Sequence, residues 1–264
     1  MLNIKNILKL QKSKKERINK NIIIVEGSQE IKMALKSNLK LKQVFICKNI
    51  YKKKKENTQF CILQKFIVSI NKITYNKIAY RKNSEGILGI FFKKKINYEK
   101  KFLNLIKKKK NILFLIIDNI EKPGNLGAII RTLECTNVVD SIIINENKDI
   151  YNPNIIRASL GSVFIFPILI FPFNKISKFL FKYNILLLGT SIQKKNNLSL
   201  YKFNFNFYKK IAIIFGNEHT GVSKKWKIYK NIHIPMYGII NSLNVSVAVS
   251  IIIFEIMRQK KIFI

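Results

Sequence analysis

Acidic residues are scarce in this chain of 264 residues, in which 14 Asp and Glu stand against 49 Lys and Arg. The resulting formal net charge of +35 predicts an anionic partner, either nucleic acid or a membrane surface. Codon composition is a competing source of this charge, because the chain is full of Lys, Ile, Asn and Phe, the amino acids of A/T-rich codons. On charge alone we favour RNA binding over compositional bias.

Arginine is rarer still, with five in the whole chain. A/T-rich coding replaces Arg by Lys, so an arginine that is kept in this background is a candidate for a functional site. The planar guanidinium fits a phosphate with two parallel hydrogen bonds, which the Lys ammonium cannot imitate. The five are Arg17, Arg81, Arg131, Arg157 and Arg258.

Cysteine is also rare: Cys47, Cys61 and Cys135 have neither an even count nor metal-ligand spacing, which predicts a reduced compartment. The longest apolar runs, near 163–173 and 245–254, are too short to span a membrane, and the N-terminal segment lacks a signal-peptide core. No nucleotide-binding glycine pattern, nucleophile elbow or cluster of metal ligands occurs. We expect a soluble cytoplasmic protein without a metal.

The length favours two domains, and the pattern of elements changes along the chain. Apolar patterning in the first part predicts a basic helix over 1–20, a second helix over 29–36, and strands over 22–25, 43–47, 60–65, 67–70 and 87–92. Lysine-rich stretches at 93–95 and 107–110 then mark a boundary. We predict a small α/β domain over 1–105, in which nothing indicates catalysis.

The second part, 106–264, alternates apolar strands with helical stretches. The strands are expected at 112–117, 141–144, 185–188, 211–215 and 231–234. Continuous apolar strands are typical of a parallel sheet buried on both faces, and their alternation with helices predicts a doubly wound α/β domain. Ligands of such domains bind outside the carboxyl ends of the strands.

The loop after the first of these strands, within 118–132, carries a distinctive set of polar residues. Pro123 and Gly124 predict a turn, and Asn125 is the expected N-cap of the helix that follows. Arg131 lies six residues further along that helix. A capped helix with a surface arginine is the plain alternative, but the scarcity of arginine favours a site.

Two later loops also follow expected strands. In 216–222, two glycines surround Glu218 and allow backbone to approach a ligand closely. The run 243–257 contains no Gly or Pro and predicts a helix that is apolar nearly all round, buried in the core or against another subunit. Ser242 and Asn244 would lie at its first turn, where free N–H groups attract polar ligand atoms.

Together, in this order, the loops resemble the three motifs of the SpoU-type branch of the SPOUT RNA methyltransferases. The motifs are matched by N-L-G-A-I-I-R-T at 125–132, by F-G-N-E-H-T-G at 215–221, and by I-P-M at 234–236 with S-L-N-V-S-V-A at 242–248. Residues 157–168 are similar to the family's segment between the first two motifs. V-E-G at 25–27 and G-I-L-G at 86–89 look like the substrate-binding domain that these enzymes often carry.

The resemblance implies a C-terminal parallel-sheet domain knotted into a deep trefoil, a smaller N-terminal RNA-binding domain, and a homodimer that builds the active site. It also implies transfer of a methyl group from S-adenosylmethionine to a ribose 2′-hydroxyl of RNA. It assigns Gly216, Ile234 and Leu243 to the cofactor. It assigns catalysis to Asn125, Arg131, Glu218, Ser242 and Asn244. Asn137 stands where the family usually has Gly, and Asn also tolerates the left-handed conformation.

Family mechanisms make Arg131 the proton acceptor, but a guanidinium is a donor without an acceptor atom and is therefore an awkward base. We therefore expect Arg131 to hold phosphate and ribose. A catalytically silent RNA-binding or ribosome-assembly protein on the same fold is the alternative, and the five intact catalytic positions favour the enzyme. A basic protein that merely binds anions would explain the charge but none of the loops. The separate N-terminal domain, with Arg17, Arg81 and its lysines, favours ribosomal over transfer RNA.

Overall fold

The computed structural model describes residues 4–51, 64–81, 83–193, 197–217 and 220–260. It divides into two compact units. The first consists of Met1–Lys95 with Asp149–Ile165, and the second consists of Ile96–Lys148 with Phe166–Ile264. The first unit is therefore built from two separate stretches of chain.

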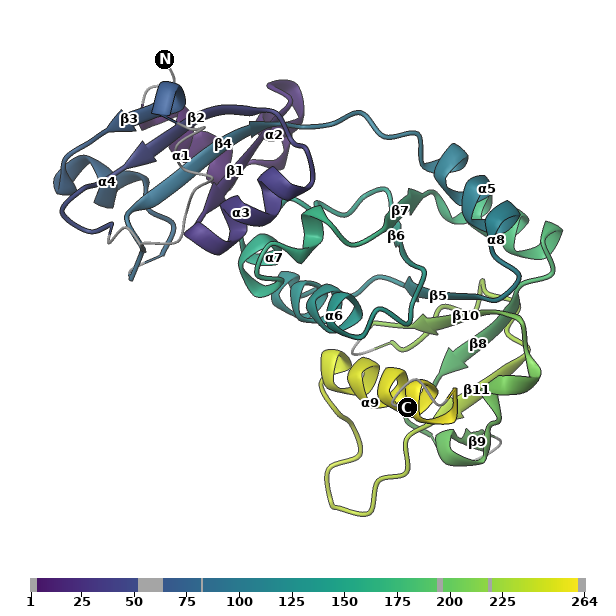
Figure 1. Cartoon of the computed structure of the whole chain (residues 1–264). Coiled ribbons are helices and arrows are strands. Elements are labelled where there is room, and N and C mark those ends of the chain that lie inside the picture. The colour runs from purple at the N-terminus through teal and green to yellow at the C-terminus, as the bar shows by residue number, and fades with distance from the viewer. Residues whose placement is uncertain (1–3, 52–63, 82, 194–196, 218–219, 261–264) are drawn as a thin grey trace. The chain divides into compact units, whose positions relative to one another are not determined.

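The first unit contains a mixed sheet of four strands in the order β1-β4-β2-β3 (Figure 1). The central strand β4 pairs antiparallel with β1 and β2, and β3 pairs parallel with β2. The strands are β1 (Ile22–Glu26), β2 (Leu41–Ile46), β3 (Ile67–Ser69) and β4 (Ile87–Phe92). The helices are α1 (Ile4–Lys12), α2 (Lys14–Asn19), α3 (Ser28–Lys36), α4 (Lys72–Ile78) and α7 (Pro153–Ala158), with short 3-10 turns η2 (Gln64–Phe66) and η3 (Ser162–Phe164).

Two predicted elements of this unit differ in the structure. The basic helix expected over 1–20 is interrupted at Ser13, whose hydroxyl accepts the N–H of Glu16 at 3.2 Å and so caps a second helix. Of the strand expected over 60–65, residues 60–63 lie outside the described residues. Residues 64–65 belong to η2, a 3-10 turn that leads into β3.

The second unit contains a seven-stranded sheet in the order β7-β6-β5-β10-β8-β11-β9, and every neighbouring pair is parallel (Figure 1). This confirms the parallel α/β architecture, while the trefoil knot stays a prediction. Within the described residues, no helix is long and apolar enough to cross a membrane. The strands are β5 (Ile112–Ile117), β6 (Ser141–Asn145), β7 (Ile168–Phe171), β8 (Leu186–Thr190), β9 (Leu198–Ser199), β10 (Lys210–Phe215) and β11 (Lys230–His233).

Helices cover both faces of this sheet, which is why strand β5 is buried along its whole length. Alternate residues of a strand point to opposite faces. Phe114 of β5 stacks on Phe102 of α5 with ring centroids 5.6 Å apart, in a core that α8 completes. Helices α6 and α9 pack against each other. The helices are α5 (Tyr98–Lys108), α6 (Pro123–Thr136), α8 (Phe173–Lys182) and α9 (Val245–Gln259), with 3-10 turns η4 (Leu200–Lys202) and η5 (Phe205–Phe207).

Candidate active site

The first and third motifs meet in the second unit. The Nδ2 of Asn244 donates a hydrogen bond to the Oδ1 of Asn125 at 3.1 Å. Asn244 is also the N-cap of α9, because its Oδ1 accepts the backbone N–H and the hydroxyl of Ser246 at 2.8 and 2.7 Å. These bonds fix the orientation of the Asn244 amide. Ser242 is exposed, and helix α9 begins at Val245, so Ser242 and Asn244 precede the first turn rather than lie in it.

The helix of the first motif begins earlier than predicted. Pro123 is its first residue and Lys122 its N-cap, so the interpretation of Asn125 as the cap is wrong. Proline suits this position, because its fixed φ and missing N–H cost nothing in the first turn of a helix. Asn125 is thereby placed inside that turn, where its side chain is available to Asn244. At the other end of α6, Asn137 has φ 50°, which confirms that it takes the left-handed position.

Arg131 is exposed on α6. Among the residues that the structure describes, it has no acidic partner and no hydrogen bond from its guanidinium. The next residue along α6 is Thr132, and its hydroxyl lies 3.2 Å from the hydroxyl of Ser250 on α9. Helix α6 thus contacts α9 through Asn125 and through Thr132, and Arg131 is the exposed residue next to Thr132.

The loop of the second motif is tightly folded on itself. A Cβ atom at Gly216 would lie 2.1 Å from the carbonyl carbon of Gly221, so only glycine fits there. The backbones of Asn217 and Gly221 exchange two hydrogen bonds, each of 3.0 Å. The close approach expected at Gly216 is therefore made by the loop's own backbone. Glu218 of the predicted catalytic set lies outside the described residues.

Asn217 is a positioning residue that we did not predict. Its buried Nδ2 donates to the backbone oxygen of Asn119 at 3.2 Å and to Oε1 of Glu121 at 2.8 Å. Its Oδ1 accepts the N–H of Thr220 at 3.1 Å. Asn217 therefore connects the loop of the second motif to the loop after β5. The signal in the sequence was an amide side chain directly after a buried strand and its glycine.

Gly216 and Ile234 follow strands β10 and β11, which lie on either side of β8 in the sheet. The segment between Ile234 and α9 exposes large apolar side chains. The exposed fraction is 92% for Tyr237, 101% for Ile239 and 76% for Ile240. Leu243 is 40% exposed. Exposed apolar surface of this kind marks a binding site, because it is stabilised when a ligand or partner covers it.

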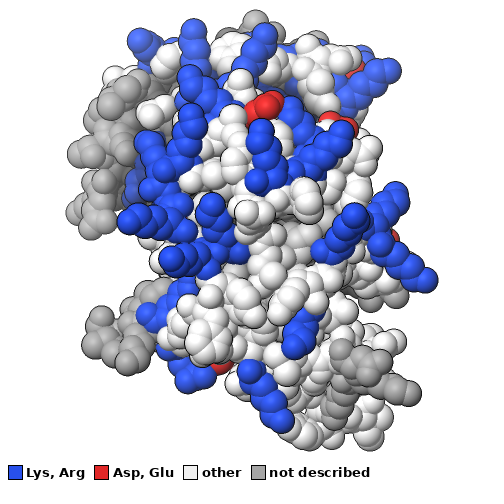
Figure 2. Space-filling model, turned by 90° about the vertical axis from the view of Figure 1, so that its right-hand side faces the viewer, with Lys and Arg blue, Asp and Glu red and all other residues white. Residues whose placement is uncertain are grey.

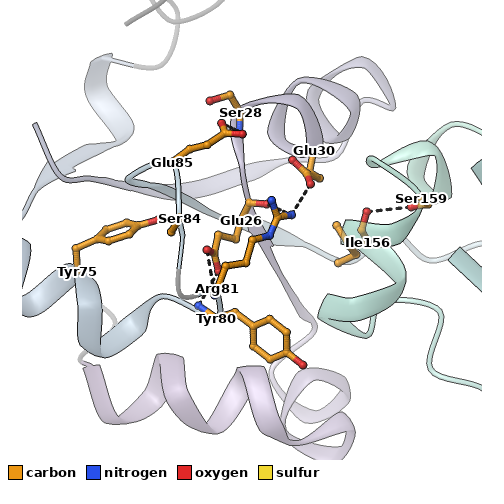
Figure 3. Close-up of polar contacts among 10 residues, drawn as sticks. All are labelled: Glu26, Ser28, Glu30, Tyr75, Tyr80, Arg81, Ser84, Glu85, Ile156 and Ser159. Carbon is orange, nitrogen blue, oxygen red and sulfur yellow. Dashed lines mark hydrogen bonds and ion pairs between the residues drawn. The ribbon is translucent and has the colours of Figure 1, made fainter. Parts of the chain in front are cut away.

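Two arginines of the first unit have structural contacts. Arg17 is buried; it forms an ion pair with Asp149 and donates to the backbone oxygens of Leu10 and Gln11. The prediction that Arg17 contacts RNA is therefore wrong. Arg81 donates to Oε1 of Glu30 at 2.5 Å and to the backbone oxygen of Glu26 at 3.3 Å (Figure 3).

The V-E-G sequence of the first unit completes this network. The side chain of Glu26 points toward the segment with Tyr80 and Arg81, and its Oε2 accepts the N–H of Tyr80 at 2.7 Å (Figure 3). Gly27 has φ 109°, and a Cβ there would lie 2.2 Å from Oε2 of Glu30. The motif therefore shapes the domain around two buried carboxylates, and Arg81 neutralises Glu30.

Arg258 also has a structural contact, at the end of α9. Its Nε and Nη2 each donate to Glu255 at 2.8 Å, and Nε2 of Gln259 adds a third bond of 2.8 Å. The Arg258 guanidinium holds the pKa of the Glu255 carboxyl below its usual value. Only Arg131 and Arg157 are left without an acidic partner in the part of the chain that the structure describes, and both are exposed.

The second unit is a parallel α/β domain in which the three motif loops follow strands β5, β10 and β11. The SpoU rRNA Methylase family matches residues 112–254, and the MRM3-like substrate binding domain matches residues 2–89. The chain belongs to the SpoU rRNA Methylase family, which confirms the resemblance drawn from its motifs. It is therefore a methyltransferase.

Relatives support this assignment along most of the chain. An uncharacterized tRNA/rRNA methyltransferase of Borreliella burgdorferi is 36% identical over 226 residues, which cover 80% of this chain and 97% of that protein. The 23S rRNA (guanosine-2′-O-)-methyltransferase RlmB of Blochmanniella floridana is 33% identical over 60% of this chain and 63% of its own. RlmB of Haemophilus ducreyi is 28% identical, with 84% and 91% covered.

Solved structures share the fold. An RNA 2′-O ribose methyltransferase superposes with a TM-score of 0.81 at 24% identity, covering 98% of this chain and 96% of that one. The SpoU methyltransferase AviRb from Streptomyces viridochromogenes, solved in complex with the cofactor AdoMet, gives a TM-score of 0.80 at 19% identity over 98% and 97% of the two chains. At these identities the likeness concerns the fold.

Proposed function

We propose that this protein transfers the methyl group of S-adenosylmethionine to a ribose 2′-hydroxyl of ribosomal RNA. The observation that carries the proposal is the hydrogen bond between Asn125 and Asn244, which joins the first and third motifs next to an exposed Arg131. Relatives named as 23S rRNA 2′-O-methyltransferases support ribosomal RNA as the substrate class.

Gly216, Ile234 and Leu243 are the residues that would hold the cofactor. They fit it, because a loop closed on Gly216 offers fixed backbone groups and the exposed apolar surface around Leu243 suits an adenosine ring. The bound cofactor supplies an activated sulfonium methyl group. What the protein must add is the alignment of the 2′-hydroxyl and the removal of its proton.

The side chains of the site can provide that alignment. The Asn125–Asn244 pair is oriented by its own hydrogen bonds and offers amide groups to a ribose hydroxyl, and Ser242 is exposed beside it. The planar guanidinium of Arg131 can bind the adjacent phosphate with two parallel hydrogen bonds. Holding the reacting atoms in line supplies several kcal/mol toward the barrier. We assign Glu218 to the same catalytic set.

The surface charge supports an RNA substrate. Figure 2 shows Lys and Arg over much of one face of the molecule, with few Asp or Glu among them. Since Arg17 is buried and Arg81 is paired with Glu30, phosphate contacts of the first unit fall to its lysines and to the exposed Arg157. Binding should weaken steeply with salt, with a log–log slope of roughly −0.7 to −0.9 per phosphate contact.

A homodimer is part of the proposal. Val247 and Phe254 on α9 are 46% and 50% exposed, and their spacing places them on one stripe of the helix. A second copy that covers this stripe and the apolar loop before it would remove that surface from water. Light scattering should show a dimer at micromolar concentration. Phe254→Glu should shift it to a monomer, and a wild-type monomer would contradict this part.

Methyl transfer is tested with cofactor labelled in its methyl group and with ribosomal and transfer RNA as separate substrates. The 2′-hydroxyl is the internal nucleophile in alkaline cleavage, so its methylation leaves label in an alkali-resistant dinucleotide. Label in a base would refute ribose methylation, and label confined to transfer RNA would refute only the substrate. No label with either RNA, despite cofactor binding by calorimetry, would favour a catalytically silent RNA-binding protein.

Arg131→Lys tests the site itself. It keeps the charge but loses the planar fork, so turnover should fall by about 100-fold, as a small misplacement of substrate does, with folding unchanged. Arg258→Lys is the control for the same change at an exposed arginine on α9, and its stability is measured alongside because Arg258 is paired with Glu255. Unchanged turnover in Arg131→Lys would remove Arg131 from the site.

A further inference from the structure

A cleft of about 730 Å³ lies in the second unit, at the carboxyl ends of β5, β6 and β7. Its size falls in the range of about 300–1,000 Å³ that is typical of small-molecule sites. Among the described residues, none that we assign to catalysis or to the cofactor lines it. In open parallel sheets ligands bind outside the carboxyl ends of the strands, so this position is itself one where a ligand is expected.

The floor of the cleft is apolar and partly aromatic. Its side chains also belong to the core between the sheet and α5 and α8, whereas Asn125 and Asn244 belong to α6 and the cap of α9. Phe173 meets Trp226 edge to face, with ring centroids 4.7 Å apart. The floor consists of Ile116, Ile143, Phe171, Phe173, Ile176 and Trp226.

Trp226, on the floor of the cleft, has a hydrogen-bond donor without a partner among the described residues. The residue is 7% exposed, and its Nε1 has no acceptor among the described residues. A buried indole N–H usually has a hydrogen-bond partner, because leaving it unpaired costs free energy. Because this Nε1 is itself covered by protein atoms, a ligand in the cleft would reach it only after neighbouring side chains move.

The rim of the cleft is polar and basic. Lys148, Lys224 and Lys225 line it, and the last two are exposed with no ion pair within the described part of the chain. Asp118 is the one acidic residue in the lining that the structure describes, and its Oδ2 already accepts the N–H of Ser223 at 2.8 Å. Four asparagines among the described residues also line the cleft: Asn119, Asn145, Asn147 and Asn217. An anionic group at the mouth and a flat apolar group inside match this arrangement.

We propose that this cleft binds a nucleotide, with its base on the floor beside Trp226 and its phosphate at Lys224 and Lys225. Aromatic and apolar side chains take bases by stacking, amides hydrogen-bond their edges, and lysines bind phosphate. If the nucleotide is part of the RNA substrate, the inference rests on the proposed function. A free mononucleotide has the same chemistry, and the experiment distinguishes the two sources.

The cleft shares one wall with the second motif. Asn217 and Gly221 line it, and they are the two residues whose paired backbones close the loop after Gly216. A nucleotide in the cleft would therefore rest against the same loop that we assign to the cofactor on its other side. Through this contact the protein would bind a second nucleotide of the RNA while the target nucleotide is methylated.

The full-length protein carries its own probe, because Trp226 is the one tryptophan in the chain. Its fluorescence is recorded during titration with each of the four nucleoside 5′-monophosphates and with a short single-stranded RNA, at saturating S-adenosylmethionine. We expect saturable quenching. In Lys224→Ala/Lys225→Ala, Kd should rise about tenfold, which corresponds to about 1.4 kcal/mol. The control Lys107→Ala/Lys108→Ala removes two exposed charges from α5 and should change Kd less than about twofold.

Cross-linking gives a second readout that does not depend on fluorescence. RNA that contains 4-thiouridine should attach within 220–227 in the parent protein and lose that attachment in the lysine double variant. Quenching by RNA and not by mononucleotides identifies an RNA nucleotide as the ligand, and quenching by both identifies a site for free nucleotides as well. Both outcomes support the cleft.

Three results would overturn the inference. They are the absence of quenching and cross-linking at this segment, an equal loss of affinity in the two double variants, and a loss of S-adenosylmethionine binding in Lys224→Ala/Lys225→Ala, which would make the cleft part of the cofactor site. If the protein methylates RNA normally but binds no nucleotide in the cleft, this inference alone is refuted. Nucleotide binding without methyl transfer would sink the proposed function alone.

Discussion

Replacing Arg17 by alanine should destabilise the first unit and leave RNA binding at the surface unaffected. The guanidinium is 5% exposed and lies between α1 and the second stretch of the unit. It pairs with Asp149 and donates to the backbone oxygens of Leu10 and Gln11, the latter at 3.0 Å. Removing it would leave one carboxylate and two carbonyl oxygens without a donor.

The magnitude follows from these contacts. Breaking a buried ion pair from one side costs about 3–5 kcal/mol. The side chain of Asp149 is 20% exposed, so water compensates part of its charge, and each carbonyl contributes about 1 kcal/mol. We expect the free energy of unfolding to fall by about 2–4 kcal/mol. With an m value of about 1–2 kcal/mol/M for a unit of this size, the urea midpoint should fall by about 2 M.

Two probes separate the units in one urea titration. Far-UV circular dichroism follows both units, whereas the fluorescence of Trp226 reports on the second. Arg17→Ala should move the dichroism transition of the first unit to lower urea and leave the Trp226 transition in place. Lys15→Ala, an exposed neighbour, is the control. A shift below about 0.5 kcal/mol, or a loss of RNA affinity at unchanged stability, would refute a structural role for Arg17.

Further predictions concern single positions. Asn217→Ala should lower turnover and S-adenosylmethionine affinity together, measured by kinetics and calorimetry, because the loop of the second motif loses its connection to Asn119 and Glu121. Asn137→Ala should lower the free energy of unfolding by about 1 kcal/mol, and Asn137→Gly should not, because φ at this position is positive. Arg258→Met should be less stable than the parent at neutral pH. Since Arg258 lowers the pKa of Glu255 in the folded protein, that stabilisation is present above the ordinary Glu pKa of about 4.3 and is lost as pH falls through the lowered value. Urea titrations at several pH values should show the two proteins converging in acid.

Five of the seven strands of the second unit were predictable, because each of the five is a continuous apolar run between polar loops. Strand β7 and the two-residue strand β9 were not predicted. The expected strand at 211–215 is β10 (Lys210–Phe215), and that at 231–234 is β11 (Lys230–His233). Strand β7 was missed, since I-L-I-F at 168–171 merges with the apolar residues before it and no polar loop marks its start. Periodicity identifies strands but does not place their boundaries within a longer apolar run.

The arginines show where reasoning from composition failed. We treated each as a candidate for a functional site, and three of the five are paired with carboxylates of the protein itself. Each of the three paired arginines contacts a carboxylate whose side chain is at most 20% exposed. Such burial depends on contacts between residues far apart in the chain, such as Arg17 and Asp149. We did not consider that the few acidic residues could themselves require the arginines. A Glu in a buried position needs a positively charged partner, and in this chain that partner is an Arg.

The divided origin of the first unit has a consequence for synthesis. Asp149 follows Arg17 by 132 residues, and the stretch that contains it emerges from the ribosome only after β5, α6 and β6 of the other unit. The fold of the nascent N-terminal part therefore remains incomplete while the start of the next unit is translated. Domains that fold strictly in the order of translation escape this delay. A fragment of residues 1–95 alone would lack the second stretch of the unit permanently. We expect such a fragment to be captured by chaperones or degraded.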